Sequence, residues 1–342
     1  MNQIISQTTF WDNSVTFYQT LQEIEYLKAT KKQYQRSHLI LEDIKPALEL
    51  LELSADEELL QEAQTNLTQL QQELETVEIQ QLMSDPCDQK GAFLTITAGV
   101  SGADAEYWAY MLLRMYSKWG ESHSYKILLV EESCGDLAGI KSASLEIIGR
   151  YAYGYLKSET GTHQLQQISP FDVTNSLRTS LASVEVLPIL GESVEWEIPE
   201  KDLEITWPRY RGNVNHVETW VNMVHIRTGI SVFCEQERSL MRNKEKALAI
   251  LKSKLFAIAL AQGVQIDKIQ PRQIKPLSNK LIREYILHPY TKVKDLRTNV
   301  ETPAATEVLD GKIDLFIKAY LQQLNHTTSV GEEALDNFKS LL

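Results

Sequence analysis

The sequence has few cysteines and no long apolar run, and both absences exclude classes of protein. Cys87, Cys134 and Cys234 are odd in number, far apart and without Cys-x-x-Cys spacing, so neither a disulfide framework nor a zinc site is predicted. No stretch approaches the roughly 18 uncharged apolar residues of a membrane-spanning helix. We therefore expect a cytoplasmic protein without a membrane partner, a metal or a cofactor.

Targeting features and excess positive charge are also missing. The N-terminal residues MNQIISQTTFWDN resemble neither a signal peptide nor an Arg-rich transit peptide. The net charge of −12 argues against indiscriminate binding to nucleic acids, because polyanions repel acidic proteins. A local basic face is still compatible with this charge, so the distribution of cations matters more than their sum.

Glycine is absent from residues 14–84, and Pro46 is the one proline there. Apolar residues recur at helical spacing in this stretch, as in LTQLQQELETVEIQQLM. The pattern predicts two or three long antiparallel helices, which would serve as an arm or spacer. Asp85 and Pro86 then end the helical unit.

After residue 90, the spacing of apolar residues changes from the helical period to the alternation that is typical of strands. The segments GAFLTITAG, YKILLVEES and SASLEIIG alternate like strands, and DAEYWAYMLLRMYSKWGES reads as an amphipathic helix. The junction from Gly99 to Trp108 resembles a phosphate-binding loop but has neither GxGxxG nor Lys-Ser/Thr, so a structural turn is favoured. The fold class is α+β with several domains.

Cations gather in a third region, residues 200–265. ISVFCEQ predicts a strand, and ERSLMRNKEKALAILKSKL predicts a helix. From composition alone, the basic face of this helix would be interpreted as an ordinary solvent-exposed surface. The cations are Arg238, Arg242, Lys244, Lys246, Lys252 and Lys254. Strand or loop material and a last helix, GKIDLFIKAYLQQL, follow. No catalytic triad or carboxylate pair can be identified from spacing, so the residues alone indicate no reaction.

Several stretches together resemble a known family. These are AGVSGADAEYWAYMLLRMYSKWGE, EESCGDLAGIKSASLEIIGRYAYGYLKSETGTHQL, the tripeptide Ser169-Pro170-Phe171, and VKDLRTNVETPAATEVLDGKIDLFI. They are similar to bacterial peptide chain release factors of class I, and the tripeptide indicates the branch that reads UGA and UAA. The resemblance runs from Trp11 to Leu321, with a later start than typical members.

The resemblance implies a domain plan. Residues 1–86 would form a helical domain, and residues 87–195 with 270–325 a superdomain that reads the codon. Residues 196–269 would be the inserted α/β domain that reaches the peptidyl-transferase centre, and residues 326–342 a C-terminal tail. A monomer is expected.

The catalytic loop of the family has no counterpart here. In the family, the Tyr-Arg matching Tyr210-Arg211 precedes a glycine-rich loop ending in Gly-Gly-Gln, whereas here Gly212 is followed directly by Asn213. The glutamine N–H of that loop stabilises developing negative charge while water attacks the ester, an oxyanion-type contribution. The resemblance therefore predicts no catalytic residue and no peptidyl-tRNA hydrolysis.

The codon-reading segment is retained only in part. Ser169, Pro170 and Phe171 match the family, and Arg178 and Thr179 fall in the codon-reading segment, with Arg178 in place of a stacking histidine. The basic and Gly-Gly neighbours of the family are replaced by Gln, Ile, Val, Thr, Asn, Ser and Leu, which removes phosphate contacts. Arg178 could still stack on a base. This pattern is equally compatible with a protein that reads stop codons and with one that retains the tripeptide by ancestry without reading codons.

The resemblance changes the interpretation of the basic helix, because the matching family segment lies against ribosomal RNA. Contact with RNA is therefore favoured over a plain solvent-exposed face.

The resemblance and the missing loop together leave three candidate functions. The first is a ribosome-bound paralogue in the A site without hydrolysis, alongside a complete release factor. The second is a protein that stabilises particular messenger RNAs, as a plastid member lacking these motifs does. The third is a release factor with atypical chemistry.

Overall fold

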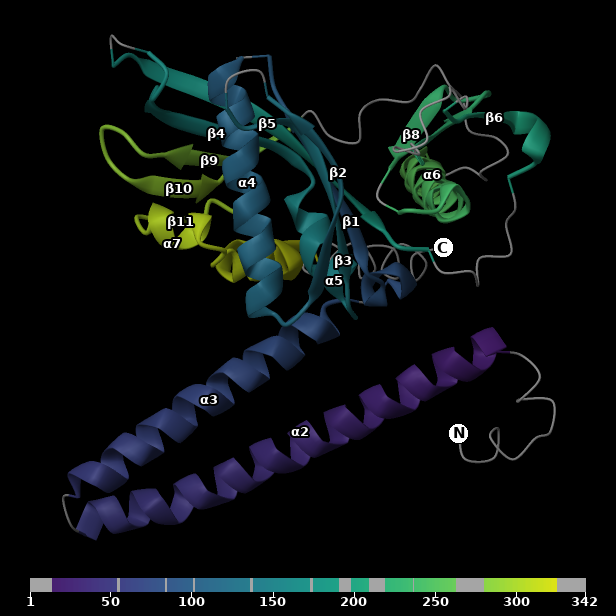
Figure 1. Cartoon of the computed structure of the whole chain (residues 1–342). Coiled ribbons are helices and arrows are strands. Elements are labelled where there is room, and N and C mark those ends of the chain that lie inside the picture. The colour runs from purple at the N-terminus through teal and green to yellow at the C-terminus, as the bar shows by residue number, and fades with distance from the viewer. Residues whose placement is uncertain are drawn as a thin grey trace, which may run out of the picture. The chain divides into compact units, whose positions relative to one another are not determined.

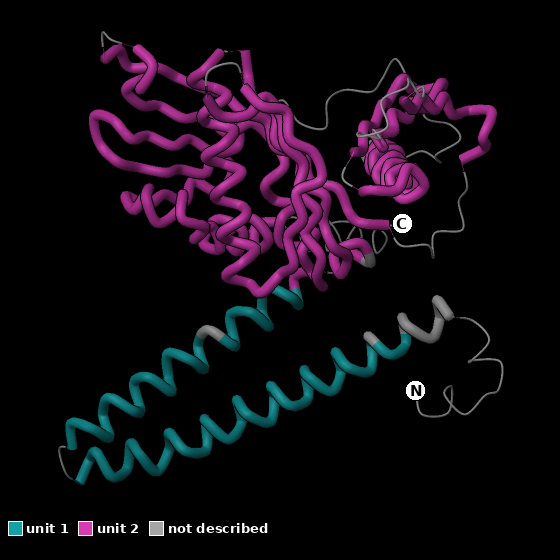
Figure 2. Tube along the Cα trace, in the orientation of Figure 1, with its two compact units in different colours: residues 1–81 teal, residues 82–342 magenta. Residues whose placement is uncertain are grey.

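The computed structural model describes ten stretches of the chain (Figure 1). They are residues 14–53, 56–83, 85–100, 102–135, 138–172, 175–190, 198–208, 219–235, 237–262 and 280–324. The predicted loop deletion at Gly212 and the tail 326–342 lie outside these residues. Two compact units divide the chain, Met1–Gln81 and Leu82–Leu342 (Figure 2). No helix within the described stretches is long and apolar enough to cross a membrane.

The first unit contains a pair of long helices, as the apolar periodicity predicts. They are α2 (Ser14–Leu53) and α3 (Glu57–Gln81), which run alongside each other as a hairpin (Figure 1). Asp56 caps the start of α3, since its Oδ1 accepts the N–H groups of Glu58 and Leu59. Ile44 and Leu70 are buried in this unit.

The second unit is built around two sheets. The helices and strands are β1 (Ala92–Ala98), α4 (Ala103–Ser122), β2 (Lys126–Cys134), β3 (Ile140–Ile148), α5 (Ala152–Leu156), β4 (Gly161–Ile168), β5 (Leu177–Pro188), β6 (Leu203–Thr206), β7 (Val221–His225), β8 (Ile230–Cys234), α6 (Leu240–Gln262), β9 (Leu281–Ile286), β10 (Lys292–Asp295), β11 (Glu301–Thr302) and α7 (Ala305–Leu309). A further helix covers residues 314–324. The α+β class expected from the sequence is confirmed.

The larger sheet has eight strands in the order β11-β10-β9-β4-β5-β1-β3-β2. Its two faces have different partners, because successive side chains of a strand point to opposite sides. On β1, Leu94 and Ile96 are fully buried on the face that α4 covers (Figure 1). Phe93 points the other way, into a core shared with α6.

The smaller sheet, β6-β7-β8, packs against α6 to form the small domain. The helix begins three residues later than predicted from the sequence, and it runs on to Gln262. The reason is Asn243, whose Oδ1 accepts the N–H of Glu237 at 2.8 Å while its Nδ2 donates to the carbonyl of Thr219 at 2.6 Å. These bonds hold residues 237–239 as the entry to the helix.

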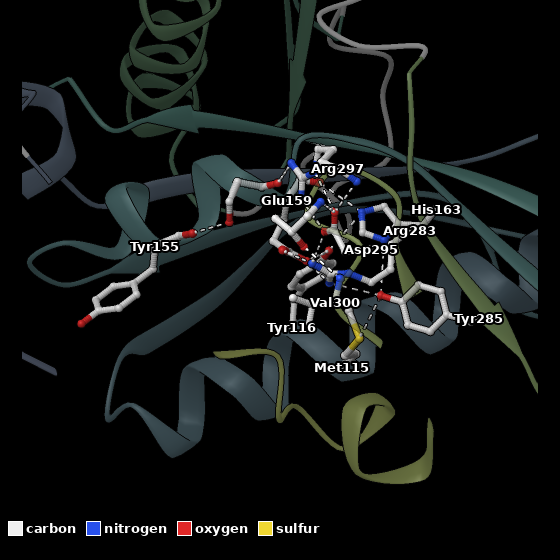
Figure 3. Close-up of polar contacts among 12 residues, drawn as sticks. Met115, Tyr116, Tyr155, Glu159, His163, Arg283, Tyr285, Asp295, Arg297 and Val300 are labelled. Atoms are coloured by element: carbon white, nitrogen blue, oxygen red, sulfur yellow. Dashed lines mark hydrogen bonds and ion pairs between the residues drawn. The ribbon is translucent and has the colours of Figure 1, made fainter. Parts of the chain in front are cut away.

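Strand β4 pairs in parallel with β9, which joins two segments that are distant in the sequence. Beneath this pair lies a buried ionic network (Figure 3). Arg283 of β9 donates to both oxygens of Glu159, at 2.6 and 2.7 Å, and approaches Asp295 of β10 at 3.3 Å. All three side chains are fully buried. Burial raises the pKa of Glu159, but the charge and hydrogen bonds of Arg283, together with the charge of Arg297, outweigh burial, so the net shift of this pKa is downward.

Neutral side chains complete this network from α4 and β4. The hydroxyl of Tyr116 donates to Glu159 at 3.1 Å, and Trp108 Nε1 donates to the carbonyl of His163 at 3.0 Å. Burial lowers the pKa of His163 to about 4, so its ring is neutral at physiological pH. The base of β4 is thereby fixed to α4 and to the C-terminal strands.

His123 gives the fold one pH-dependent contact. Its two ring nitrogens lie near acceptors, the carbonyl of Trp119 at 2.9 Å and the carboxylate of Asp314 at 3.2 Å. Burial lowers the pKa of His123, but the hydrogen bond and charge of Asp314 outweigh burial, so the net shift is upward. A raised folded pKa stabilises the fold fully below the unfolded value of about 6.5, and this contribution disappears as pH rises through the folded value.

We therefore expect the contribution of His123 to stability to decline as pH rises from 5.5 to 8.5. Urea unfolding at both pH values should show a larger decrease in the wild type than in Asp314→Asn, which removes the acceptor charge. Equal decreases in the two proteins would contradict this assignment.

Candidate functional site

The predicted codon-reading residues lie at the tip of one β-hairpin. Strands β4 and β5 pair in antiparallel register up to Gln167 opposite Arg178 and Ile168 opposite Leu177. The hairpin then closes through the N–H of Ser169, which donates to the carbonyl of Ser176 at 3.1 Å. The structure thus places the tripeptide and Arg178 at the same end of one hairpin.

Ser169 is held by the first turn of α4. Its hydroxyl donates to Oδ1 of Asp104 at 2.7 Å, and its oxygen accepts the N–H of Phe171 at 3.2 Å. Gly102 precedes this helix with φ +64°, a left-handed conformation that favours glycine. Ser169 is buried, so its hydroxyl is engaged inside the protein and not presented to solvent.

Phe171 is the partly exposed member of the tripeptide. Its ring lies edge-on to Tyr107 of α4, with the ring centroids 5.8 Å apart and the planes at 81°. This contact fixes one edge of the ring, while 39% of the residue surface is open to solvent. Phe171 can therefore offer a ring face to a base or to an apolar group.

Arg178 is exposed but has internal partners. Its Nη2 donates to Oδ2 of Asp172 at 3.2 Å and its Nε to the hydroxyl of Ser176 at 3.1 Å. Ser176 also donates to Asp172. Thr179, two positions after Leu177, is exposed and pairs with Gln166 of β4. The replacement residues Val173 and Thr174 lie outside the described part of the chain.

Asp172 neutralises the one cation of this group, which leads to a testable expectation. Asp172→Asn should free the Arg178 guanidinium for a phosphate and strengthen binding to an RNA oligonucleotide containing UGA. For single strands, one added phosphate contact steepens the dependence of log K on log salt by about 0.7. Filter binding across a salt series measures this slope, and Asp310→Asn serves as the matched control far along the chain. An unchanged slope would contradict the role assigned to Asp172.

The six cations of the small domain do not share one surface. Arg238 and Arg242 are exposed, and Lys244 and Lys252 are half-buried. The other two point toward the large sheet. Lys246 pairs with Glu146 of β3 at 2.7 Å, and Lys254 lines a cavity with residues of β2. Helical periodicity could have separated these faces, but nothing in the sequence shows that a second sheet covers one of them.

Two site residues escaped the sequence analysis, namely Asp104 and Asp172. Asp104 is distant from the tripeptide in sequence, and only the fold brings it to Ser169. Asp172 follows Phe171 directly, so its position beside the tripeptide was a signal that could have been used. Among the described residues, no cluster of His, Cys, Asp and Glu has the arrangement of a metal site.

Comparison with known proteins identifies the family. A PCRF domain matches residues 1–184 and an RF-1 domain residues 192–297. The chain is 45% identical to peptide chain release factor PrfB1, chloroplastic, of Arabidopsis thaliana, over 93% of this chain and 71% of that protein. It is 40% identical to peptide chain release factor 2 of Clostridium perfringens, over 93% of this chain and 89% of that protein.

A solved structure agrees with this assignment. RF2 of Thermus thermophilus superposes with a TM-score of 0.66 and 32% sequence identity, covering 94% of this chain and 92% of that one. The fold predicted from the resemblance is therefore confirmed. The chain belongs to the bacterial-type peptide chain release factors, in the release factor 2 branch.

Proposed function

We propose that this chain is a release-factor-like translation protein that binds the ribosome at the stop-codon site and does not hydrolyse peptidyl-tRNA. Its relatives are named peptide chain release factors, which supports a role in translation termination. The family hydrolyses the peptidyl-tRNA ester, and the proposal departs from the family on this point alone.

One observation carries the loss of hydrolysis. The sequence contains no two adjacent glycines, so the Gly-Gly-Gln tripeptide is absent, and Gly212 adjoins Asn213. The surrounding domain nevertheless has an intact core, with Met223, Cys234 and Leu251 fully buried. If the whole sequence had degenerated, the core of this domain would be expected to have lost its packing as well. A shortened loop on a well-packed domain therefore supports a protein that has kept the fold of the domain and lost its hydrolytic activity.

The decoding hairpin supports binding at the codon. Ser169 and Phe171 are held by Asp104 and Tyr107 in one defined arrangement, and ordered groups lose less entropy on binding. Exposed Arg238 and Arg242 on the small domain are the proposed contacts to ribosomal RNA, with Lys244 and Lys252 beside them. These site assignments, and the domain boundaries at residues 86, 195, 269 and 325, are part of the proposal.

The experiment combines binding and chemistry in one sample. Ribosomes with a UGA codon in the A site and a labelled peptidyl-tRNA are mixed with the chain and sedimented. We expect the chain in the pellet and the peptide still attached to tRNA. A matched sample with a sense codon reports on codon reading. Free peptide in the supernatant would overturn the loss of hydrolysis, and a chain absent from the pellet would overturn ribosome binding.

A second candidate is the binding of particular messenger RNAs. It is favoured by the decoding tip, where Asp172 pairs with the one arginine while Arg238 and Arg242 remain exposed elsewhere. Crosslinking in cells with sequencing of the copurified RNA separates the two candidates. Reads from the decoding centre support the ribosomal function, whereas peaks in a few transcripts support the alternative.

The compartment follows from the same proposal. Release factor 2 of bacteria and the chloroplastic PrfB1 are both similar to this chain. The proposed function is compatible with location in a bacterial cytoplasm and with location in a plastid. In either compartment, a complete release factor would carry out termination.

A further inference from the structure

The helical hairpin of the first unit exposes apolar side chains at regular intervals. Every seventh residue of α2 from position 27 to 48, and of α3 from position 60 to 74, is an exposed leucine or tyrosine. These stripe residues are Leu27, Tyr34, Leu41 and Leu48 on α2, and Leu60, Leu67 and Leu74 on α3. A seven-residue repeat places such side chains in one stripe along a helix, the pattern of helices that pack against each other along their length.

The two stripes lie on the same face of the hairpin, with a groove of about 410 Å³ between them. Tyr34 and Leu41 line this groove from α2, and Leu74 lines it from α3. Other side chains are buried in the hairpin, among them Ile44 and Leu70, each three positions after a stripe residue. The hairpin therefore packs without burying its stripes, which form a surface suited to further helices.

The carboxylate that lines the groove is satisfied inside the hairpin. Glu73 accepts hydrogen bonds from the hydroxyl of Ser37 and, at 3.0 Å, from Nε2 of Gln69. The bond from Ser37 is the largest influence on the pKa of Glu73 and lowers it. A helix laid on the groove therefore leaves this charge with its partners, which a buried charge requires.

The two rims of the groove carry opposite charges. Residues three positions after a stripe residue, such as Ser37, face the opposite helix, so those one and four positions after it lie on the outer side. On α2, Lys28 and Lys31 occupy these outer positions beside one stripe residue. On α3, Glu75 and Glu78 occupy the same two positions, and all four charged residues are exposed. The surface is thus apolar in the middle, basic along one rim and acidic along the other.

We propose that a second copy of this chain covers the groove, so that two hairpins form a four-helix bundle with the stripe residues in its core. The charges select one arrangement. With the twofold axis parallel to the helices, α2 of each copy lies over α3 of its partner, and a basic rim meets an acidic rim twice. A twofold axis across the helices would instead bring the two acidic rims together. In the selected arrangement all neighbouring helices are antiparallel, a common form of four-helix bundle.

The register of the hairpin identifies the charges that meet. The hydrogen bond between Ser37 and Glu73 places these residues at the same height. Lys31 lies six residues before Ser37. Glu78 lies five residues after Glu73, which puts it at nearly the height of Lys31 in this antiparallel pair. Lys31 of each copy therefore lies beside Glu78 of its partner. The bundle replaces the monomer expected from the sequence, and it does not depend on ribosome binding.

The dimer is tested by sedimentation equilibrium of the full chain, from nanomolar to high micromolar concentration. We expect the wild type to reach twice the mass of one chain. Leu74→Lys places a charge from each copy in the core of the bundle, so this variant should stay monomeric. Leu74 is 53% exposed in the single chain, so helix content by circular dichroism should not change. A wild type that remains monomeric throughout overturns the proposal and leaves the groove to a helix of another protein.

Exchange of charges tests the arrangement. Lys31→Glu and Glu78→Lys each turn attraction into repulsion at two symmetric contacts, so each variant alone should dimerise about tenfold more weakly at low salt. An equimolar mixture of the two variants should recover wild-type affinity, because both contacts of the mixed dimer again join a lysine to a glutamate. A mixture that associates no better than either variant overturns the arrangement.

The matched control is Lys32→Glu. Lys32 is exposed and adjacent to Lys31, but the turn of about 100° per residue places it on the far side of α2 from the stripe. Its charge change is the same, so we expect the dimer affinity of this variant to stay within about twofold of the wild type. A loss as large as that of Lys31→Glu would trace the effect to net charge and overturn the assigned contact.

Discussion

Arg283→Met is expected to lower the free energy of unfolding of the second unit by about 3–5 kcal/mol. The side chain is fully buried, donates to both oxygens of Glu159 and lies 4.3 Å from the centroid of the Phe316 ring. Removal leaves the buried carboxylate of Glu159 without its cation. Methionine retains much of the apolar volume, so the loss measures charge compensation rather than a cavity.

The measurement is urea unfolding followed by tryptophan fluorescence, since Trp108 and Trp119 of α4 are fully buried. Lys312→Met is the matched control, because it removes a cation from an ion pair whose side chains are 75% and 60% exposed. Exposed pairs contribute up to about 1 kcal/mol. A loss of that small size for Arg283→Met would show that water reaches Glu159 and that the network is not a buried one.

The second large effect concerns peptide release. On ribosomes stopped at UGA, we expect release by this chain to be at least about 10²–10³ times slower than release by a complete release factor 2. One lost oxyanion-type donor already costs that much, and the missing loop also removes the backbone that would carry the donor. Single-turnover release of a labelled peptide at saturating protein measures the chemical step separately from binding.

The control for this test is the chain with a glycine-rich loop ending in Gly-Gly-Gln inserted between Gly212 and Asn213. Binding should be unchanged by the insertion, which isolates the chemistry from affinity. Release within tenfold of the complete factor by the unmodified chain would refute the loss of hydrolysis. It would also require a catalytic group elsewhere in the chain.

Local patterns predicted only part of this fold. The apolar period of residues 14–84 gave the two long helices, and the alternation in GAFLTITAG gave β1, because each pattern reflects one buried face. The hairpin strands β4 and β5 were not identified from periodicity. Their segments mix Gln, Ser and Thr with few apolar residues on the outer face, so the signal of a half-buried strand is weak.

Long-range pairing could not be predicted from local patterns. The parallel pairing of β4 with β9 brings Arg283 to Glu159, and no spacing rule connects these positions. The same holds at the site, where Asp104 finds Ser169 only through the fold, and on α6, where a sheet distant in sequence engages Lys246. Family resemblance supplied the site that periodicity could not.

The parallel pairing of β4 with β9 has a consequence for synthesis of the chain. Thr162 pairs with Leu281, about 120 residues further along, and a ribosome adding about 5–20 residues per second needs roughly 6–24 s to cover that distance. During this interval the hairpin that carries the tripeptide has already been synthesised, but its strand β4 does not yet have β9 to pair with. A nascent copy therefore completes the sheet around the tripeptide hairpin only after β9 has been synthesised.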